Sequence, residues 1–233
     1  MPITVLTPSI EQRMAAYVEL TNRVRLMAPP AQLKPTITLS REFGCEAFPV
    51  AEELVKVAEQ KTGESWLLVD KSLLDEVAKD HRISQEIMHS LGEKPRFIDE
   101  MFATFSKNWK GDADYYYRLL CEQVVMVATA GNAVIVGLGA AIITKAMKNC
   151  FHFRLIAHHD FKVRSIARRM NIPKQEAEII VLNQQKERDR IIRRVLDADE
   201  HEPLHYHVIF NNAKIKNPQI AEIIFDHVFS SKG

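Results

Sequence analysis

Ten arginines and lysines gather between residues 162 and 194, where only four carboxylates offset them. Arg164 and Arg168 are four residues apart, a spacing that places both on one face of a helix, and Arg190 and Arg194 repeat it. Guanidinium stays charged and binds phosphate bidentately, so two such helices predict a clamp for a triphosphate. A solvated basic surface is the alternative that the pattern leaves open. The basic residues are Lys162, Arg164, Arg168, Arg169, Lys174, Lys186, Arg188, Arg190, Arg193 and Arg194.

A second candidate site follows the apolar run at 36–39, where the chain reads SREFGCEA over residues 40–47. A turn between a buried strand and a helix presents backbone N–H groups to an anion. This turn has one glycine, Gly44, no lysine, and a carboxylate at Glu46. A carboxylate about 4 Å from a phosphate oxygen costs on the order of 4 kcal/mol at an effective dielectric of about 20. The turn therefore predicts a phosphate loop only if Arg41 or a metal ion compensates Glu46.

The composition sets limits on these sites. A chain of 233 residues is long enough for one α/β domain or two small ones. The 31 basic and 30 acidic side chains give a net charge of +1, so no overall field attracts nucleic acid or a membrane surface. Three cysteines without CxxC spacing favour free thiols in a reducing compartment. We therefore expect a cytoplasmic protein, and the first residues show no signal-peptide pattern.

Residues 123–144 carry no charge over nearly the length of a membrane span. However, Gly131 and Asn132 interrupt the run, and 133–136 is rich in β-branched residues. A helix, a turn and a buried strand therefore fit this segment better than a membrane helix.

The elements that must position these side chains alternate between strand and helix. Most of the strand candidates are continuously apolar, which is typical of parallel strands covered on both faces. The alternation predicts an α/β fold with a parallel sheet of about five strands and right-handed crossovers. We expect strands at 36–39, 66–69, 133–136, 151–156 and 206–210, and helices at 9–27, 48–61, 70–90, 95–130, 140–149, 159–170, 173–196 and 217–230.

Five stretches in order resemble the cytidylate kinase-like family, over about residues 36–228. They are TITLSREFG (36–44), VDKSLLDEVA (69–78), VIVGLGA (134–140), FRLIAHHDFKVRSIARR (153–169) and QQKERDR (184–190). The resemblance implies a P-loop NTPase-like three-layer sandwich with helices on both faces of the sheet. It implies a kinase-like domain at 35–233 behind an N-terminal helical extension at 1–34. Within the domain it implies a helical acceptor-binding insert at 70–130 and an arginine-rich lid at 160–196.

The resemblance also implies roles for individual residues. The nucleotide-binding loop would comprise Ser40, Arg41, Gly44, Cys45, Glu46 and Ala47. Acceptor binding would fall to Asp70, Lys71, Gly137 and Gly139, with the two glycines under the bound phosphates. The catalytic lid cations would be Arg164, Arg168, Arg188 and Arg190. ATP and Mg²⁺ would be the cofactors and a nucleoside monophosphate or other small molecule the acceptor, with no protein metal ligands assigned. Outside the resemblance, the helix predicted at 9–27 is expected to pack on the domain or on a second subunit in a homodimer, and packing on the domain is favoured.

Two departures from the family pattern keep the activity open. Where the family tends to have Gly-Ser-Gly-Gly, this chain has Gly44-Cys45-Glu46-Ala47, and neither a lysine nor a hydroxyl follows. Leu138 stands where the family generally has arginine. In one interpretation Arg41 replaces the lysine, and Glu46 turns outward or holds Mg²⁺. In the other, phosphoryl transfer is lost and a nucleotide-sensing or protein-interaction role remains; a fold that binds no nucleotide is the third alternative.

Three weaker signals accompany these motifs. His205 and His207 would share one face of a strand and, with His201, suggest a metal site, although strand-edge histidines are favoured. Asp160 is expected to cap the helix that follows it. Cys45 precedes a helix, where the pKa of a thiol is expected to fall.

Overall fold

The computed structural model describes residues 9–26, 33–79 and 112–230. Its centre is a sheet of five parallel strands in the order β2-β3-β1-β4-β5. β1 (Thr36–Arg41) pairs with both β3 (Ala133–Val136) and β4 (Cys150–Ile156), while β2 (Leu67–Val69) and β5 (Val208–Asn211) form the edges. The five predicted strands are all present, with ends shifted by no more than two residues.

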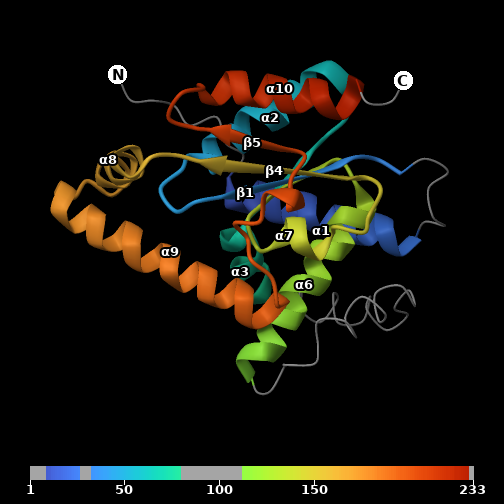
Figure 1. The fold of residues 1–233 in the computed structure, drawn as a ribbon. Helices are drawn as coiled ribbons and strands as arrows, with labels where there is room; N and C mark the ends of the chain where they lie inside the picture. The colour runs from blue at the N-terminus through green and yellow to red at the C-terminus, as the bar shows by residue number, and fades with distance from the viewer. Residues whose placement is uncertain (1–8, 27–32, 80–111, 231–233) are drawn as a thin grey trace.

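Helices cover both faces of the sheet (Figure 1), which confirms the predicted three-layer fold. One face carries α2 (Ala47–Thr62) and α10 (Asn217–Ser230). The other carries α1 (Ile10–Leu26), α3 (Lys71–Lys79), α6 (Asp112–Ala130) and the short α7 (Ala140–Ile143). A hairpin of α8 (His159–Met170) and α9 (Lys174–Leu196) extends beside the sheet, and the 3₁₀ turn η2 (Pro203–His205) precedes β5.

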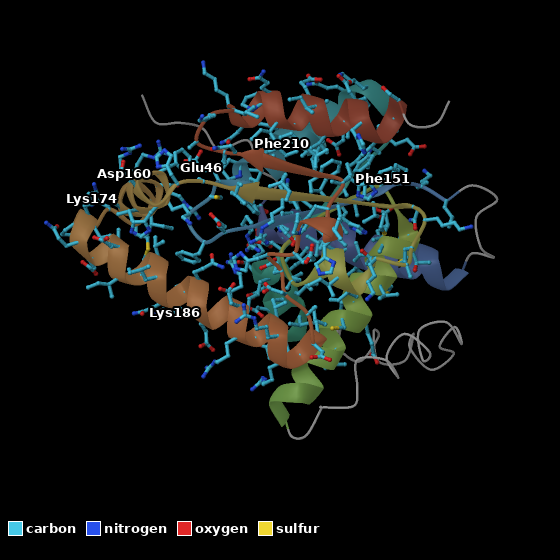
Figure 2. All side chains as sticks on the ribbon, viewed as in Figure 1. Glu46, Phe151, Asp160, Lys174, Lys186 and Phe210 are labelled. Carbon is cyan, nitrogen blue, oxygen red and sulfur yellow. The ribbon has the colours of Figure 1, made fainter. Side chains whose placement is uncertain are left out.

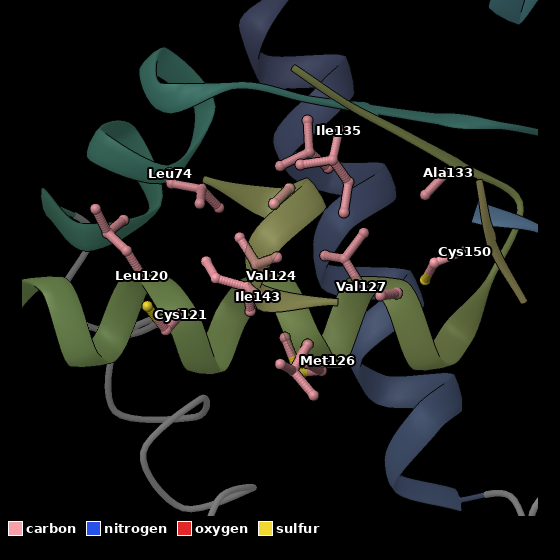
Figure 3. Close-up of a cluster of buried hydrophobic side chains, with 14 of the residues drawn as sticks. Leu74, Leu120, Cys121, Val124, Met126, Val127, Ala133, Ile135, Ile143 and Cys150 are labelled. Atoms are coloured by element: carbon pink, nitrogen blue, oxygen red, sulfur yellow. The ribbon is translucent and has the colours of Figure 1, made fainter. Parts of the chain in front are cut away.

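Two apolar cores hold these layers. In the first, Ile37 and Leu39 of β1 pack with Leu54 of α2 and Ile224 of α10. The second lies between the opposite face and α1, α3 and α6 (Figure 3), and it extends to the end of α9 at Leu196. Because the last turns of α9 belong to this core, the far end of the hairpin is anchored to the domain.

The central strands also carry a row of buried polar residues, which differs from the continuously apolar strands predicted. Thr38 and Ser40 of β1 lie beside His152 and Arg154 of β4 in the parallel register. The hydroxyl of Thr38 lies 2.9 Å from Nδ1 of His152, so this pair satisfies two buried polar groups. Arg154 is the member of this row that lies toward the carboxyl end of β4, and it is 2% exposed.

The N-terminal helix α1 contacts α3, α6 and β2. The guanidinium of Arg13 donates to the backbone oxygen of Leu68 at 3.1 and 3.2 Å and to Asp70 at 2.7 Å. Tyr17 is completely buried and its hydroxyl bonds the side chain of Gln123. These contacts place α1 on the domain, where it stabilises the end of β2.

The largest departure from the predicted helices is α7, which ends at Ile143 rather than near residue 149. The side-chain amide of Asn149 donates to the backbone oxygens of Ala128 and Lys34, and the backbone carbonyl of Asn149 accepts from the N–H of Thr36. These bonds hold Asn149 beside the start of β1. The helix must therefore end before residue 149. Of the predicted 70–130 insert, residues 80–111 lie outside the described residues. No helix in the described part of the chain has the length and apolar character that a membrane span requires.

Candidate functional site

A pocket of about 240 Å³ opens at the carboxyl edge of the sheet. In open α/β folds this edge is where ligands bind. The ends of β1 and β3 form its floor, while α6 and the second half of α9 form its walls. Polar groups line one part of the pocket and aliphatic side chains the rest. The polar lining residues are Arg41, Lys71, Tyr117, Gln184, Glu187, Arg188 and Glu200; the apolar ones include Leu120, Val136, Leu138, Ile191, Ile192, Val195 and Leu196.

Arg41 lies in this pocket because Gly137 leaves room for it. A Cβ on Gly137 would come within 1.7 Å of Nη1 of Arg41, so the guanidinium rests directly on the glycine. Gly137 also has a φ of 75°, a backbone conformation that side-chain-bearing residues rarely adopt. Gly139 has the same function toward α9, since a Cβ there would lie 2.4 Å from Leu196. Gly137 and Gly139 are the two glycines that were predicted to lie under a phosphate. In the structure Gly137 leaves space for Arg41, and Gly139 leaves space for Leu196 of α9.

Arg188 reaches the same pocket from α9. Its Nη1 donates to the backbone oxygen of Arg41 at 3.0 Å, and its guanidinium lies over the ring of Phe43, 5.5 Å from the centroid. Burial is the main cause that lowers the pKa of Arg188, and burial followed by the charge of Arg188 lowers the pKa of Arg41 to about 9. Both groups remain protonated at neutral pH, so the pocket holds two adjacent, partly desolvated cations, an arrangement suited to an anion.

The predicted phosphate loop is present between β1 and α2, and protein groups already accept from three of its amides. The N–H of Phe43 donates to Oε1 of Gln185 at 2.7 Å, and the N–H of Glu46 donates to Oδ1 of Asn212 at 2.7 Å. The N–H of Cys45 bonds the carbonyl of Glu42 at 3.1 Å. An anion that uses the amides of Phe43 and Glu46 must therefore displace or share side-chain acceptors from α9 and from the end of β5.

The carboxylate of Glu46 is paired with a lid arginine, Arg168, and not with Arg41. Its carboxylate accepts from the guanidinium of Arg168, from the hydroxyl of Ser165 at 3.3 Å and from the side-chain amide of Asn217 at 2.9 Å. These donors come from α8 and α10, and Figure 2 shows Glu46 beside α8. One predicted lid cation thus neutralises the carboxylate that the sequence places in the loop. Ala47, the last predicted loop residue, is buried as the first residue of α2.

The close approach of α8 to this loop depends on Gly44. A Cβ on Gly44 would lie 2.6 Å from Cβ of Lys162 in α8. Lys162 forms an ion pair of 2.8 Å with Glu42, whose carboxylate also accepts from the N–H of Ala157. The loop therefore contacts α8 in two ways, through the close approach of Gly44 and through the ion pair of Glu42 with Lys162.

The other two predicted lid arginines do not reach the pocket. Arg164 is exposed and pairs with Asp160 one turn earlier, and Lys174 joins the same carboxylate at 2.7 Å (Figure 2). Arg190 is exposed and pairs with Glu187 at 2.8 Å. Of the four predicted lid cations, the structure places Arg188 in the pocket, Arg168 at the loop, and the other two on the surface.

Asp70 and Lys71 lie at the start of α3. Asp70 accepts from Arg13 at 2.7 Å and from the N–H of Leu73 at 3.1 Å, so it caps α3 and holds α1. Lys71 lines the pocket and pairs with Asp75 at 2.6 Å. The carboxylate of Asp70 is therefore engaged by the N-terminal helix, a partner that sequence reasoning did not suggest.

The sequence did not predict a cluster of polar contacts around the buried side chain of Arg154. Arg154 donates to the hydroxyl of Tyr206 at 3.2 Å and lies 3.3 Å from Nδ1 of His201. Tyr206 in turn donates to the backbone oxygen of Glu200 at 2.7 Å. An arginine inside a strand pattern was the one signal for this group. Ser40 was predicted to belong to the phosphate loop. In the structure it is a buried residue of β1 that lies beside Arg154.

Three of the weaker sequence predictions are wrong. Burial raises the pKa of Cys45 to about 12, the reverse of the expected fall, because the thiol lies in an apolar core. His158, not Asp160, caps α8, since its Nδ1 accepts from the N–H of Phe161. His205 belongs to η2, so it does not share a strand face with His207. Within the described residues, no group of three or more His, Cys, Asp or Glu side chains is arranged to hold a metal ion.

The fit to the expected cofactors is therefore uneven. Two converging guanidiniums suit a phosphate. Phe48 follows the loop where a hydroxyl would bind Mg²⁺, and Glu46 is already engaged, so the described residues do not form a protein site for that ion.

A five-stranded parallel sheet of order 2-3-1-4-5, with a loop after its central strand and a helical hairpin over that loop, defines a P-loop kinase-like protein. The chain belongs to the cytidylate kinase-like family, whose model matches residues 36–214. This confirms the resemblance drawn from the sequence.

Among solved structures, an uncharacterized protein from Eubacterium ventriosum ATCC 27560 matches with a TM-score of 0.63 and 21% identity, over 84% of this chain and 99% of that one. Shikimate kinase from Bacteroides thetaiotaomicron matches with a TM-score of 0.44 and 16% identity, over 84% of this chain and 98% of that one. A TM-score below 0.5 does not establish a shared fold. A search of the curated proteins found no match.

Proposed function

We propose that this protein binds ATP with Mg²⁺ and transfers a phosphoryl group to a small acceptor, such as a nucleoside monophosphate. The observation that carries the proposal is the convergence of Arg41 and Arg188 in one pocket at the carboxyl edge of the sheet. Phosphoryl transfer depends mostly on positioning and charge neutralisation, and two desolvated guanidiniums supply both. Membership of a kinase-like family agrees with this activity.

The cationic and the aliphatic residues of the pocket would have different roles in the transfer. Arg188 and Arg41 bind phosphate oxygens bidentately and offset the negative charge of the transferred group. The aliphatic side chains of Leu120, Ile192 and Leu196 exclude water from the pocket. Mg²⁺ bound to ATP would supply further charge neutralisation at the phosphates, without a ligand from the described residues. The proposal includes a cytoplasmic location and no nucleic-acid or membrane partner.

A second function is favoured by the phosphate loop itself. The amides of Phe43 and Glu46 are bonded to protein oxygens, and Arg168 is paired with Glu46. A loop satisfied in this way gains less from a triphosphate than an open one, because protein–protein hydrogen bonds must be exchanged. This observation supports a catalytically impaired kinase-fold protein with a nucleotide-sensing or protein-interaction role.

The two functions are separated by binding and turnover measurements. Thermal shift with ATP and ADP, each with and without Mg²⁺, reports binding, because a ligand that binds the native state raises its stability. ADP formation with a panel of nucleoside monophosphates reports transfer. Binding with turnover supports the kinase, and binding without turnover supports the sensor. No stabilisation by millimolar nucleotide refutes the kinase and the nucleotide sensor, and leaves the protein-interaction role.

One pair of variants tests the pocket. Arg188→Ala removes a pocket cation and should weaken ATP binding at least about tenfold, the effect of one charge-assisted hydrogen bond. Arg193→Ala is the matched control, since Arg193 is an exposed arginine of the same helix that pairs with Asp199 at 3.2 Å. Equal effects of the two substitutions would show that Arg188 contributes only to the general positive charge of α9.

The predicted division at residue 35 and the homodimer also remain proposals. Deletion of residues 1–34 should destabilise the chain, because it removes the bonds of Arg13 to Leu68 and Asp70. Size-exclusion chromatography of the full chain tests the dimer directly.

A further inference from the structure

Glu200 is a buried carboxylate with an unused oxygen. The residue is 3% exposed, and its Oε2 has no hydrogen-bond partner. The cation that it pairs with, Nη1 of Arg154, lies 3.8 Å away, beyond hydrogen-bond distance. Buried charged oxygens in native proteins almost always accept hydrogen bonds, so this one indicates a missing donor.

The position of Glu200 suggests where that donor comes from. Glu200 lines the same pocket as Arg41 and Arg188, and its charge acts on both guanidiniums. The backbone of Glu200 is held by the hydroxyl of Tyr206. A ligand in the pocket would therefore meet one carboxylate together with two cations.

The charges around Glu200 define the chemistry of the donor. Three guanidiniums, those of Arg41, Arg154 and Arg188, act on this one carboxylate or lie beside it. An ammonium or a divalent cation at Oε2 would lie close to these guanidiniums and would be repelled by them. A neutral hydroxyl is not repelled, and it can donate one hydrogen bond to Oε2.

The remaining walls define the rest of the ligand. Two of the cations, Arg41 and Arg188, line the pocket and suit a phosphate group. Leu138, Ile191 and Val195 offer apolar contact to the body of the molecule. A volume of about 240 Å³ restricts that body to a small molecule.

We infer that Glu200 is the specificity-determining residue of this pocket, and that it accepts a hydrogen bond from a hydroxyl of a small phosphate monoester. The inference rests on the proposed function, in which Arg41 and Arg188 bind the phosphate that is transferred, and it takes the part of the pocket beside Glu200 as the acceptor site. Glu200 acts in recognition and takes no part in proton transfer. Its effect therefore falls on acceptor affinity and not on ATP affinity.

The test compares phosphate monoesters with and without hydroxyls. Isothermal titration calorimetry measures the affinity of glycerol 3-phosphate against propyl phosphate, and of a nucleoside monophosphate against its 2′,3′-dideoxy counterpart. A hydrogen bond to a charged acceptor predicts a preference of about 10- to 100-fold for the hydroxylated member of at least one pair. Binding without discrimination in both pairs would overturn the inference, as would failure of all four compounds to bind.

Two variants assign the preference to Glu200. Glu200→Gln keeps an acceptor oxygen but loses its charge, so the preference should fall to about threefold. Asp199→Asn is the matched control, because Asp199 is the neighbouring carboxylate and its side chain is 49% exposed. It should keep the full preference. An undiminished preference in the Glu200→Gln variant refutes the assignment, and the comparison of ligands in the unmodified protein holds even if that variant fails to fold.

The titrations also distinguish this inference from the proposed function. ATP affinity is measured on the same samples. Retained ATP binding without hydroxyl preference overturns the role of Glu200 and leaves the proposed function in place. Hydroxyl preference without ATP binding overturns the proposed function and leaves Glu200 as the recognition residue of a phosphate-ester pocket.

Discussion

Replacement of Gly137 by alanine should remove Arg41 from the pocket without touching Arg41 itself. The added Cβ would lie 1.7 Å from Nη1 and 2.7 Å from Cζ, so the guanidinium must move. The φ of 75° at this position adds a backbone cost of about 1–2 kcal/mol for a residue with a side chain. We expect Gly137→Ala to lower the free energy of unfolding by more than this amount, and anion affinity to fall about 10- to 100-fold.

Gly63 provides a matched control for the backbone cost. Its φ is 69°, and a Cβ there would meet nothing within 4 Å. Gly63→Ala should therefore show the backbone cost alone, about 1–2 kcal/mol, with anion affinity unchanged. Urea unfolding measures the first quantity, and calorimetry with ATP or a phosphate monoester measures the second.

A double substitution completes the test. In an Arg41→Ala background the clash disappears, so Gly137→Ala should cost no more there than Gly63→Ala does in the unmodified chain. The reasoning is refuted if Gly137→Ala leaves anion affinity intact, or if its cost in unfolding free energy is the same with and without Arg41.

Three further predictions concern other parts of the structure. Burial, followed by the charge of His207, lowers the pKa of His152 to about 4 from 6.5, so the unfolded chain binds a proton that the native chain does not. The free energy of unfolding should therefore fall by about 3 kcal/mol between pH 6.5 and 4, as followed by urea titration, and His152→Gln should remove most of this dependence; an unchanged slope would contradict it. Arg168→Ala should weaken ATP binding about tenfold more when Glu46 is present than in a Glu46→Gln background, because the carboxylate is then uncompensated; equal losses in calorimetry would exclude this coupling. All three cysteines are buried, and burial raises the pKa of the Cys45 thiol to about 12, so a chromogenic thiol reagent at pH 8 should react with none of them until denaturant exposes all three. Rapid reaction of the native protein would refute that.

The sequence predicted the scaffold well because the scaffold depends on local patterns. Short, mostly apolar runs of four to six residues mark the strands, and helical spacing marks α8 and α10, whose ends fall where predicted. The order of five motifs along the chain identified the family. Burial in a parallel sheet and strand–helix alternation are properties of neighbours in sequence, so a single chain carries them.

The candidate site was harder to predict because its contacts join distant residues. Arg164, Arg168, Arg188 and Arg190 look alike in the sequence, yet only Arg188 enters the pocket. Which arginine does so depends on the side of α9 that faces Arg41 at the end of β1, and on the local carboxylates at Asp160 and Glu187. The pairing of Arg168 with Glu46 spans 122 residues, and no local pattern announces it.

Buried polar partners were likewise beyond reach. Arg13 lies 57 residues from Asp70, and Glu200 lies in a turn that the sequence marks only as acidic. Such pairs form because folding leaves a charge without water, and the group that satisfies it is chosen by three-dimensional proximity.

Helix α9 contacts both the phosphate loop and the segment that follows β3. Near its middle, Gln185 holds the amide of Phe43 in the phosphate loop; 11 residues later, about 16 Å along the helix axis, Leu196 packs over Gly139 beside the acceptor pocket. A stiff helix acts as a lever between such points. Any acceptor that tilts α9 alters how readily Gln185 gives up its amide, and thermodynamic reciprocity requires nucleotide on the loop to change acceptor affinity by the same factor.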